Sequence, residues 1–137
     1  MTTVPLPPSP ASRPTRILLV EDDKFLRKAA EVTLKRQGFD VLTAQDGEAG
    51  LELAREAMPD LVLLDLIMPK MQGFQVLGHL KADRKTASIP VIVMSNLGQD
   101  SDVQRAIDAG ASAYVVKSNT ALQSLVDTVR EILAKAM

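Results

Sequence analysis

Short apolar runs that end abruptly at charged or hydroxyl side chains are the feature that most constrains the fold of this chain. The runs are residues 17–20, 61–64, 91–94 and 113–116, and the polar groups that follow them are Glu21, Asp22 and Asp23, then Asp65, Ser95 and Lys117. Because the carboxyl ends of parallel strands lie along one edge of a sheet, these side chains would converge on one small site.

The apolar runs alternate with amphipathic stretches. Strands are predicted near residues 16–20, 40–44, 60–65, 90–94 and 113–116. Helices are predicted between the acidic residues and Gly38, over 46–56, 72–83 and 100–109, and from Leu122 onward, with Gly110 as a helix stop. The third and fourth strands are apolar on both faces, as strands covered by helices on either side are. This alternation predicts an α/β fold with an open, doubly wound parallel sheet and right-handed crossovers.

Length and charge narrow the class of protein. At 137 residues the chain falls in the range of one domain. Sixteen basic against seventeen acidic residues give a net charge of -1, which argues against a basic nucleic-acid-binding face. Cysteine is absent, and no apolar run approaches the roughly twenty residues that span a bilayer. We expect a cytoplasmic protein that neither inserts into a membrane nor binds nucleic acid directly.

The first 15 residues differ from the rest of the chain. They carry prolines among Ser and Thr, at Pro5, Pro7, Pro8, Pro10 and Pro14. These prolines supply few hydrogen-bond donors and interrupt every stretch that could form the apolar centre of a secretory signal. We expect a disordered tail over 1–15 and a single domain over 16–137.

The clustered carboxylates indicate metal chemistry. Glu21, Asp22 and Asp65 would repel one another at close range unless a cation neutralised them. Oxygen ligands without Cys or His favour Mg²⁺ or Mn²⁺, and the ligands still missing suggest a phosphoryl group. Lys117 and Ser95 are the kinds of group that would hold phosphoryl oxygens, and Asp65 would be the nucleophile that forms an aspartyl-phosphate. Taken without these partners, the acidic residues after the first strand could equally be a solvated loop that caps a helix.

This constellation closely resembles the receiver domain of two-component response regulators. The matching segments, as they stand here, are 19–23, Asp65 to Pro69 with Gly73, 89–95 and 110–117, and the resemblance covers about residues 16 to 136. It implies a flavodoxin-like sheet in the order 2-1-3-4-5 with five helices. It also implies a signalling switch in a phosphorelay, which accepts a phosphoryl group on Asp65 from a histidine kinase or a histidine phosphotransfer protein.

The resemblance assigns further roles residue by residue. The metal would be held by Asp22, Asp65 and the backbone carbonyl of Ile67, with Glu21 acting mainly through water. Ser95 and Lys117 would bind the phosphoryl group.

Ser95 would also form a switch pair with Tyr114. In that mechanism the Ser95 hydroxyl moves toward the phosphoryl group and vacates space for the Tyr114 ring, which remodels the face around the fifth strand. The signal would be a changed surface that an unidentified downstream protein recognises.

Some positions depart from the family's usual pattern. Ser118 follows Lys117 where a proline is common, and Asn96 stands where a very small residue is usual. Ile67 and Leu97 are apolar at two positions that influence attack of water on the phosphoryl group, so we expect slow autodephosphorylation.

Two other functions stay open on the sequence. Ser118 and Asn96 also fit a receiver-like interaction module that is never phosphorylated. A phosphohydrolase of the haloacid-dehalogenase type would share the aspartyl nucleophile, but it needs an acid where Ile67 stands, so we expect a phospho-acceptor and not a turnover enzyme. The sequence leaves dimerisation through the last helices undecided, along with the cognate kinase.

Overall fold

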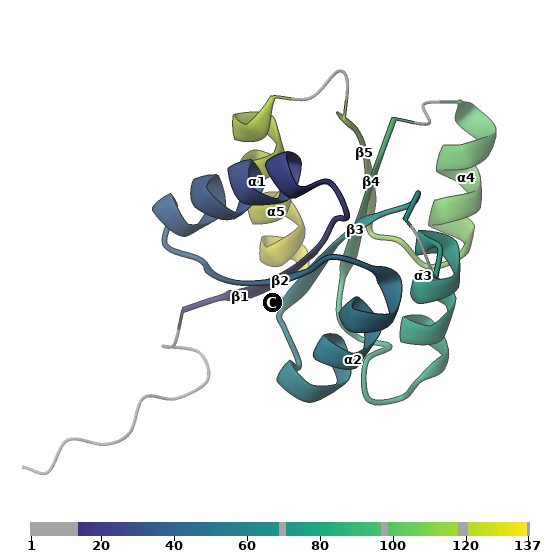
Figure 1. The fold of residues 1–137 in the computed structure, drawn as a ribbon. Helices are drawn as coiled ribbons and strands as arrows, with labels where there is room; N and C mark the ends of the chain where they lie inside the picture. The colour runs from purple at the N-terminus through teal and green to yellow at the C-terminus, as the bar shows by residue number, and fades with distance from the viewer. Residues whose placement is uncertain (1–13, 69–70, 97–98, 118–120, 137) are drawn as a thin grey trace, which may run out of the picture.

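Strands and helices alternate along the whole described chain (Figure 1). A computed structural model describes residues 14–68, 71–96, 99–117 and 121–136. The strands are β1 (Arg16–Val20), β2 (Asp40–Ala44), β3 (Leu61–Asp65), β4 (Val91–Ser95) and β5 (Ala113–Val116). The helices are α1 (Lys24–Arg36), α2 (Gly47–Ala57), α3 (Gly73–Ala82), α4 (Asp100–Asp108) and α5 (Leu122–Ala136). The predicted strands and the three predicted middle helices lie within one residue of these bounds.

The strands form one parallel sheet in the order β2-β1-β3-β4-β5. The predicted doubly wound architecture is therefore confirmed. The chain moves outward from β1 to β2, then crosses to β3 and continues in the opposite direction, so the strand order reverses between β1 and β3. In sheets of this kind, ligands bind in a crevice at that point, beyond the carboxyl ends of the strands.

Local signals in the sequence set the ends of the helices. The Asp23 side chain caps α1 by accepting hydrogen bonds from the amides of Phe25 and Leu26, at 2.9 and 3.1 Å. Gly38, with φ of +93°, and Gly110, with φ of +106°, follow the ends of α1 and α4 in the left-handed region that glycine tolerates. Both glycines act as the helix stops that the sequence predicts.

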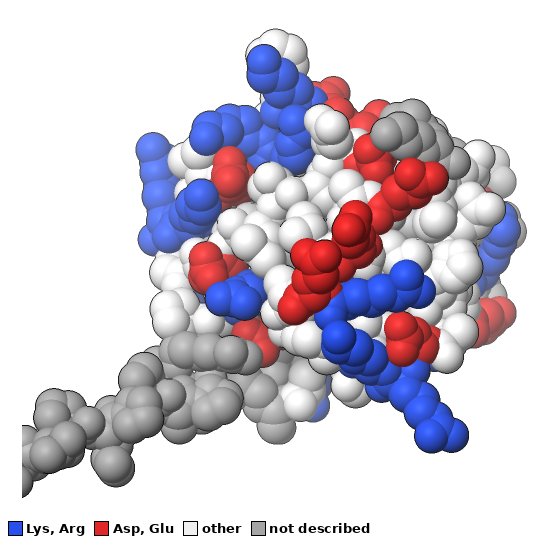
Figure 2. Space-filling view, turned by 60° about the horizontal axis from the view of Figure 1, so that its bottom comes forward, with Lys and Arg blue, Asp and Glu red and all other residues white. Residues whose placement is uncertain are grey.

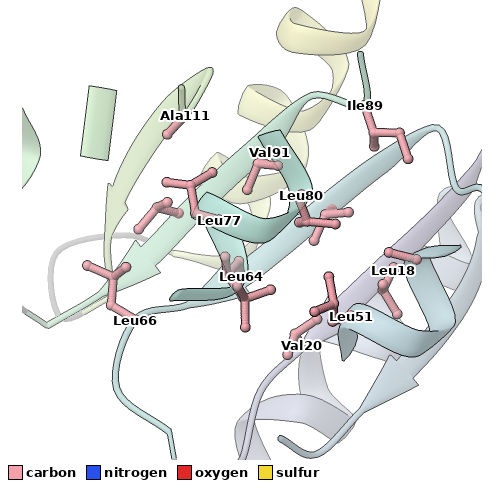
Figure 3. Packing of buried hydrophobic residues seen from close by; sticks show 14 of the residues in the cluster. Leu18, Val20, Leu51, Leu64, Leu66, Leu77, Leu80, Ile89, Val91 and Ala111 are labelled. Carbon is pink, nitrogen blue, oxygen red and sulfur yellow. The ribbon is translucent and has the colours of Figure 1, made fainter. Parts of the chain in front are cut away.

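Each face of the sheet is covered by its own layer of helices. Alternate residues of the central strands point to opposite faces, so Leu18 belongs to one buried cluster and Leu19 to the other. One cluster joins the sheet to α2, α3 and α4, and the other joins it to α1 and α5 (Figure 1). In Figure 3, Leu51 of α2 and Leu77 and Leu80 of α3 lie over the strands of the first cluster. The two layers bury most of β1 and all of β3 and β4, and Asp65 and Ser95 stand at the carboxyl ends of β3 and β4.

Glycines allow the α2–α3–α4 layer to approach the sheet closely. A Cβ atom at Gly73 would overlap the carbonyl oxygen of Asp65, and one at Gly50 would lie 2.8 Å from Cγ2 of Val20. Real side-chain carbons do not come this close to their neighbours, so larger residues there would push the helices outward. Gly73 thereby fixes the start of α3 against the last residue of β3.

Charged side chains of both signs are mixed over the surface. In Figure 2, acidic side chains form a diagonal band across the middle of the view, and Lys and Arg lie beside its lower end and in groups at the upper left and lower right. Among the described helices, none combines the length and apolar character that crossing a bilayer requires.

The expected tail lies almost wholly outside the described residues. Residues 1–13 are not among them, and Thr15 accepts a hydrogen bond from the Asp40 amide at 2.9 Å. The packed chain therefore already includes Thr15.

Candidate functional site

The carboxyl edge of the sheet brings together the polar groups that end the apolar runs. Glu21 and Asp22 follow β1, Asp65 ends β3, Ser95 ends β4 and Lys117 follows β5. All of them line one open pocket of about 250 Å³. Residues separated by up to 96 positions along the chain therefore share one site, as the sequence predicts.

Lys117 is the cationic centre of this pocket. Its Nζ lies 2.5 Å from Oε1 of Glu21 and 3.2 Å from Oδ2 of Asp65. The two carboxylates are nearly inaccessible to solvent, whereas the Lys117 side chain is 18% exposed. One ammonium group thus balances part of the negative charge of two buried acids and leaves the third acid, Asp22, toward solvent.

The acidic cluster fits a hard divalent cation. Oxygens of Glu21, Asp22 and Asp65 lie within 4.8 Å of one another, and two of these three residues are buried. An oxygen-only donor set with an open side is what Mg²⁺ prefers, because this ion keeps several waters and takes few carboxylates. The residues present therefore fit the predicted Mg²⁺ or Mn²⁺. Asp23 is not part of the cluster, because its carboxylate caps α1.

The surroundings of Asp65 disfavour the ionised form of its carboxyl group. Its pKa is raised from 3.8 to about 7, mainly by burial and further by the neighbouring Glu21 carboxylate, while Lys117 opposes the rise. Burial also acts to lower the pKa of Lys117, but Glu21 and Asp65 outweigh it and raise that pKa above the usual value. Lys117 is therefore charged at neutral pH, and a cation beside Asp65 would favour the ionised, nucleophilic carboxylate.

The loop after β1 is held by a residue that the sequence did not single out. Nη1 of Arg27 donates to the backbone carbonyls of Glu21 and Asp22, at 2.9 and 3.3 Å. The Asp23 amide donates to Oε2 of Glu21 at 3.2 Å. A basic residue near the start of a helix is unfavourable for the helix dipole. This unfavourable position is the feature by which Arg27 could have been identified in the sequence. Arg27 fixes the backbone that presents the two acids.

Ser95 and Tyr114 are adjacent, on β4 and β5. Ser95 is buried, and Tyr114 packs beside the cluster that joins the sheet to α2, α3 and α4. Burial raises the pKa of the Tyr114 phenol, while a hydrogen bond with the Ser95 hydroxyl opposes the rise. The structure thus places the predicted switch pair in contact. Their role in switching stays a prediction.

Ile67, one of the two residues predicted to tune dephosphorylation, lies at the rim of the pocket. Ile67 is 57% exposed, lines the pocket, and donates its amide to Oδ1 of Asp65 at 3.3 Å. Asn96 is exposed and lines the same pocket. Leu97 and Ser118 lie outside the described residues. The rim beside Asp65 is therefore part apolar and part polar.

Comparisons with known proteins agree on one protein family. The sequence matches the family model of the response regulator receiver domain over residues 17–130. It is 41% identical over 102 residues to the DNA-binding dual master transcriptional regulator RpaA of Synechocystis sp., covering 74% of this chain and 42% of that protein. It is 44% identical over 101 residues to the transcriptional regulatory protein AfsQ1 of Streptomyces coelicolor, covering 74% and 44%. The matched part is less than half the length of these two relatives.

Solved structures share the fold. The chemotaxis response regulator CheY4 of Vibrio cholerae aligns with a TM-score of 0.82 at 25% identity, covering 88% of this chain and 99% of that chain. A CheY-like receiver domain protein from Methanospirillum hungatei JF-1 aligns with a TM-score of 0.84 at 24% identity, covering 90% and 97%. The second likeness concerns the fold alone.

Proposed function

This chain belongs to the response regulator receiver domain family, whose general function is a phosphorylation switch, and on that premise we propose that Asp65 is its phospho-acceptor. Receiver domains of this family interact with histidine kinases. The donor we propose is a phosphohistidine on such a kinase or on a histidine phosphotransfer protein. The receiver unit we propose is residues 16–137.

The observation that carries the proposal is the environment of Asp65. Its Oδ2 faces the ammonium group of Lys117 at 3.2 Å, and its Oδ1 accepts the Ile67 amide. The two remaining acids of the cluster lie beside it. A nucleophile, a fixed cation and a metal-binding pair thus meet in one open pocket, which is the arrangement that phosphoryl transfer requires.

The chemical step moves one phosphoryl group. A carboxylate oxygen of Asp65 forms a bond to phosphorus, the P–N bond of the donor phosphohistidine breaks, and its electron pair returns to the imidazole nitrogen. Lys117 would balance negative charge on the phosphoryl oxygens, and the Ser95 hydroxyl would donate to one of them.

Bound Mg²⁺ or Mn²⁺ would supply a Lewis acid for the same oxygens. Asp22, Asp65 and the Ile67 carbonyl would hold it. Glu21, which is paired with Lys117 in this structure, would reach it through water.

The output would be a change of surface around β5. When the Ser95 hydroxyl turns to the phosphoryl group, its hydrogen bond with Tyr114 is lost. The Tyr114 ring then moves into the space that Ser95 leaves, and the face formed by α4, β5 and α5 changes for a downstream protein partner.

Contact with the donor would use apolar side chains near the pocket. Phe25 is 82% exposed and Leu26 48% exposed at the start of α1, and Leu26 and Ile67 both line the pocket. A donor protein that covers them would exclude water from the transfer step.

Phosphorylation by a small donor tests the proposal. The chain is incubated with Mg²⁺ and acetyl phosphate, and modified protein is separated on a phosphate-affinity gel with and without hydroxylamine. We expect a hydroxylamine-sensitive band in the wild type and none in Asp65→Asn. Asp127→Asn, which removes an exposed carboxylate on α5, is the matched control and should behave as wild type.

The other outcomes would assign the chain elsewhere. An unmodified wild type with intact folding would favour the interaction module. Repeated release of phosphate from phosphate esters would favour a phosphohydrolase, although the exposed Ile67 offers no acid to protonate a leaving group.

We further propose that the phosphorylated state decays slowly, because Ile67 presents an apolar side chain where water would approach. Ile67→Asn should shorten the lifetime of the phosphoryl group in a phosphate-release assay. An unchanged decay rate would contradict this assignment while leaving Asp65 as the acceptor.

A further inference from the structure

The α1–α5 layer contains a second pocket beside the phospho-acceptor site. Strands supply Leu19 and Val115, α1 supplies Leu26 and Ala29, and α5 supplies Leu122 and Leu125. Leu26 and Leu122 are 48% and 39% exposed and so lie at the mouth, while Leu125 is buried. The pocket therefore runs from solvent between the two helices down to the sheet.

The size and chemistry of this pocket select a class of ligand. Its volume is about 170 Å³, and nearly all of its lining is carbon. An engineered apolar cavity of about 150 Å³ in another protein binds benzene. The charged lining residues, Glu21 and Lys117, are already paired with each other, so a charged or strongly polar guest would lose hydration here with little hydrogen bonding in return. A neutral apolar molecule with one ring is therefore the best match.

The pocket shares two walls with the phospho-acceptor site. Glu21 and Lys117 line both, and they form the 2.5 Å ion pair. The aliphatic stem of Lys117 can pack against an apolar guest while its ammonium group stays with the carboxylates. A guest would thus stabilise the arrangement in which Lys117 is paired with Glu21.

We propose that the α1–α5 pocket binds a small neutral apolar molecule and that this binding competes with phosphorylation through Lys117 and Glu21. When a phosphoryl group draws Lys117 away from Glu21, the pocket loses part of its wall, so ligand affinity falls. By linkage, the bound ligand weakens the binding of a phosphoryl mimic to the acceptor site by the same factor. The competition rests on the proposed function, whereas the binding itself does not.

Benzene is the probe for binding. Titration into methyl-labelled protein, with chelator present, should give saturable shifts of the Leu19, Val115 and Leu125 methyl signals with a dissociation constant on the order of 1 mM. Ala29→Leu fills the pocket from an exposed helical position and should weaken binding by about tenfold or more. Ala134→Leu, the same change on an exposed part of α5 away from the pocket, is the control and should bind as wild type.

The competition is tested on the same sample. Adding Mg²⁺ and beryllium fluoride, which mimics the phosphoryl group, should weaken benzene binding by about fivefold, and Asp65→Asn should bind benzene without this response. Saturating benzene should weaken the binding of beryllium fluoride by about fivefold in the wild type and leave its binding to Ala29→Leu unaffected.

Each outcome decides one point. Shifts that never saturate, or that persist in Ala29→Leu, overturn the pocket and leave the phospho-acceptor role intact. If the protein is phosphorylated and benzene binding saturates but does not weaken with beryllium fluoride, the proposed competition is wrong. Saturable binding in a protein that is never phosphorylated overturns the proposed function instead.

Discussion

The two helical layers differ in how they meet the functional edge of the sheet. On the α2–α3–α4 side, Gly73 brings α3 against the backbone of Asp65 with no room for even a methyl group. On the α1–α5 side, the layer leaves a pocket of about 170 Å³ next to Lys117. The backbone of Asp65, the proposed acceptor, is therefore held by close packing, and Lys117 stands beside open space.

This difference separates two requirements of a switch. A nucleophile such as the one proposed at Asp65 must keep its geometry, because small displacements slow phosphoryl transfer strongly. The groups that respond to the phosphoryl group must move. Close packing around Asp65 meets the first requirement, and the looser surroundings of Lys117 allow the second.

The largest loss of stability is expected when a side chain is added at the closely packed α2–α3–α4 layer. Gly73→Ala should lower the free energy of unfolding by more than about 4 kcal/mol, because the new methyl group overlaps backbone atoms of Asp65 and Leu66 that cannot move aside. Urea unfolding measures the change. Gly78→Ala, in the same helix with open space around it, is the control and should stabilise the protein by about 0.5–1 kcal/mol. Equal effects at both glycines would contradict the contrast between the layers.

Leucine truncations compare the layers directly. Leu77→Ala, in the α2–α3–α4 cluster, should cost about 4 kcal/mol, because the void left there is fully enclosed. Leu125→Ala should cost about 2 kcal/mol, because it enlarges a pocket that already opens to solvent. Thermal unfolding of both variants checks the order, and a larger loss for Leu125→Ala would reverse the assignment of close and loose packing.

The burial of Asp65 predicts a pH dependence of stability. Because its folded pKa of about 7 lies above 3.8, the folded chain binds more protons between these values, and stability falls as the pH rises through that window. Asp65→Asn, which imitates the protonated form, should therefore stabilise the protein by about 2–4 kcal/mol at about pH 8 and much less at about pH 5. Unfolding is measured with chelator present.

The pH dependence of stability has a matched control and an outcome that would contradict it. Asp127→Asn, on the surface of α5, should change stability little at either pH. A gain from Asp65→Asn that is equal at both pH values would show that burial does not strain the carboxyl.

The smallest change in stability is expected from a larger side chain in the α1–α5 layer. Ala29→Leu should change the free energy of unfolding by less than about 0.5 kcal/mol. The position is exposed, the added carbons enter the existing pocket, and leucine favours the helix nearly as well as alanine. A loss comparable with that of Gly73→Ala would mean that the α1–α5 side is packed as closely as the other.

Much of the fold could be predicted because local and global signals agree. The apolar runs, Gly38, Gly110 and the Asp23 cap each specify their element through nearby residues, and the strand bounds follow within one residue. The convergence of Asp65 with Lys117 was also predictable, because parallel strands share one edge.

Other properties of the site were hidden in the sequence. Neither the pairing of Lys117 with Glu21 nor the hold of Arg27 on the acidic loop follows from spacing. Both depend on the paths of long side chains across distant segments, which periodicity does not record. The apolar pocket was hidden for the same reason, since its lining residues look like ordinary core positions.

The sequence by itself therefore determined which residues end the strands and at which edge they meet, because chain direction and side-chain alternation are local properties. Only the tertiary structure decided how closely each helical layer approaches that edge. Packing distances arise from contacts among residues far apart in the chain, and they set the burial of Asp65 and the free space beside Lys117.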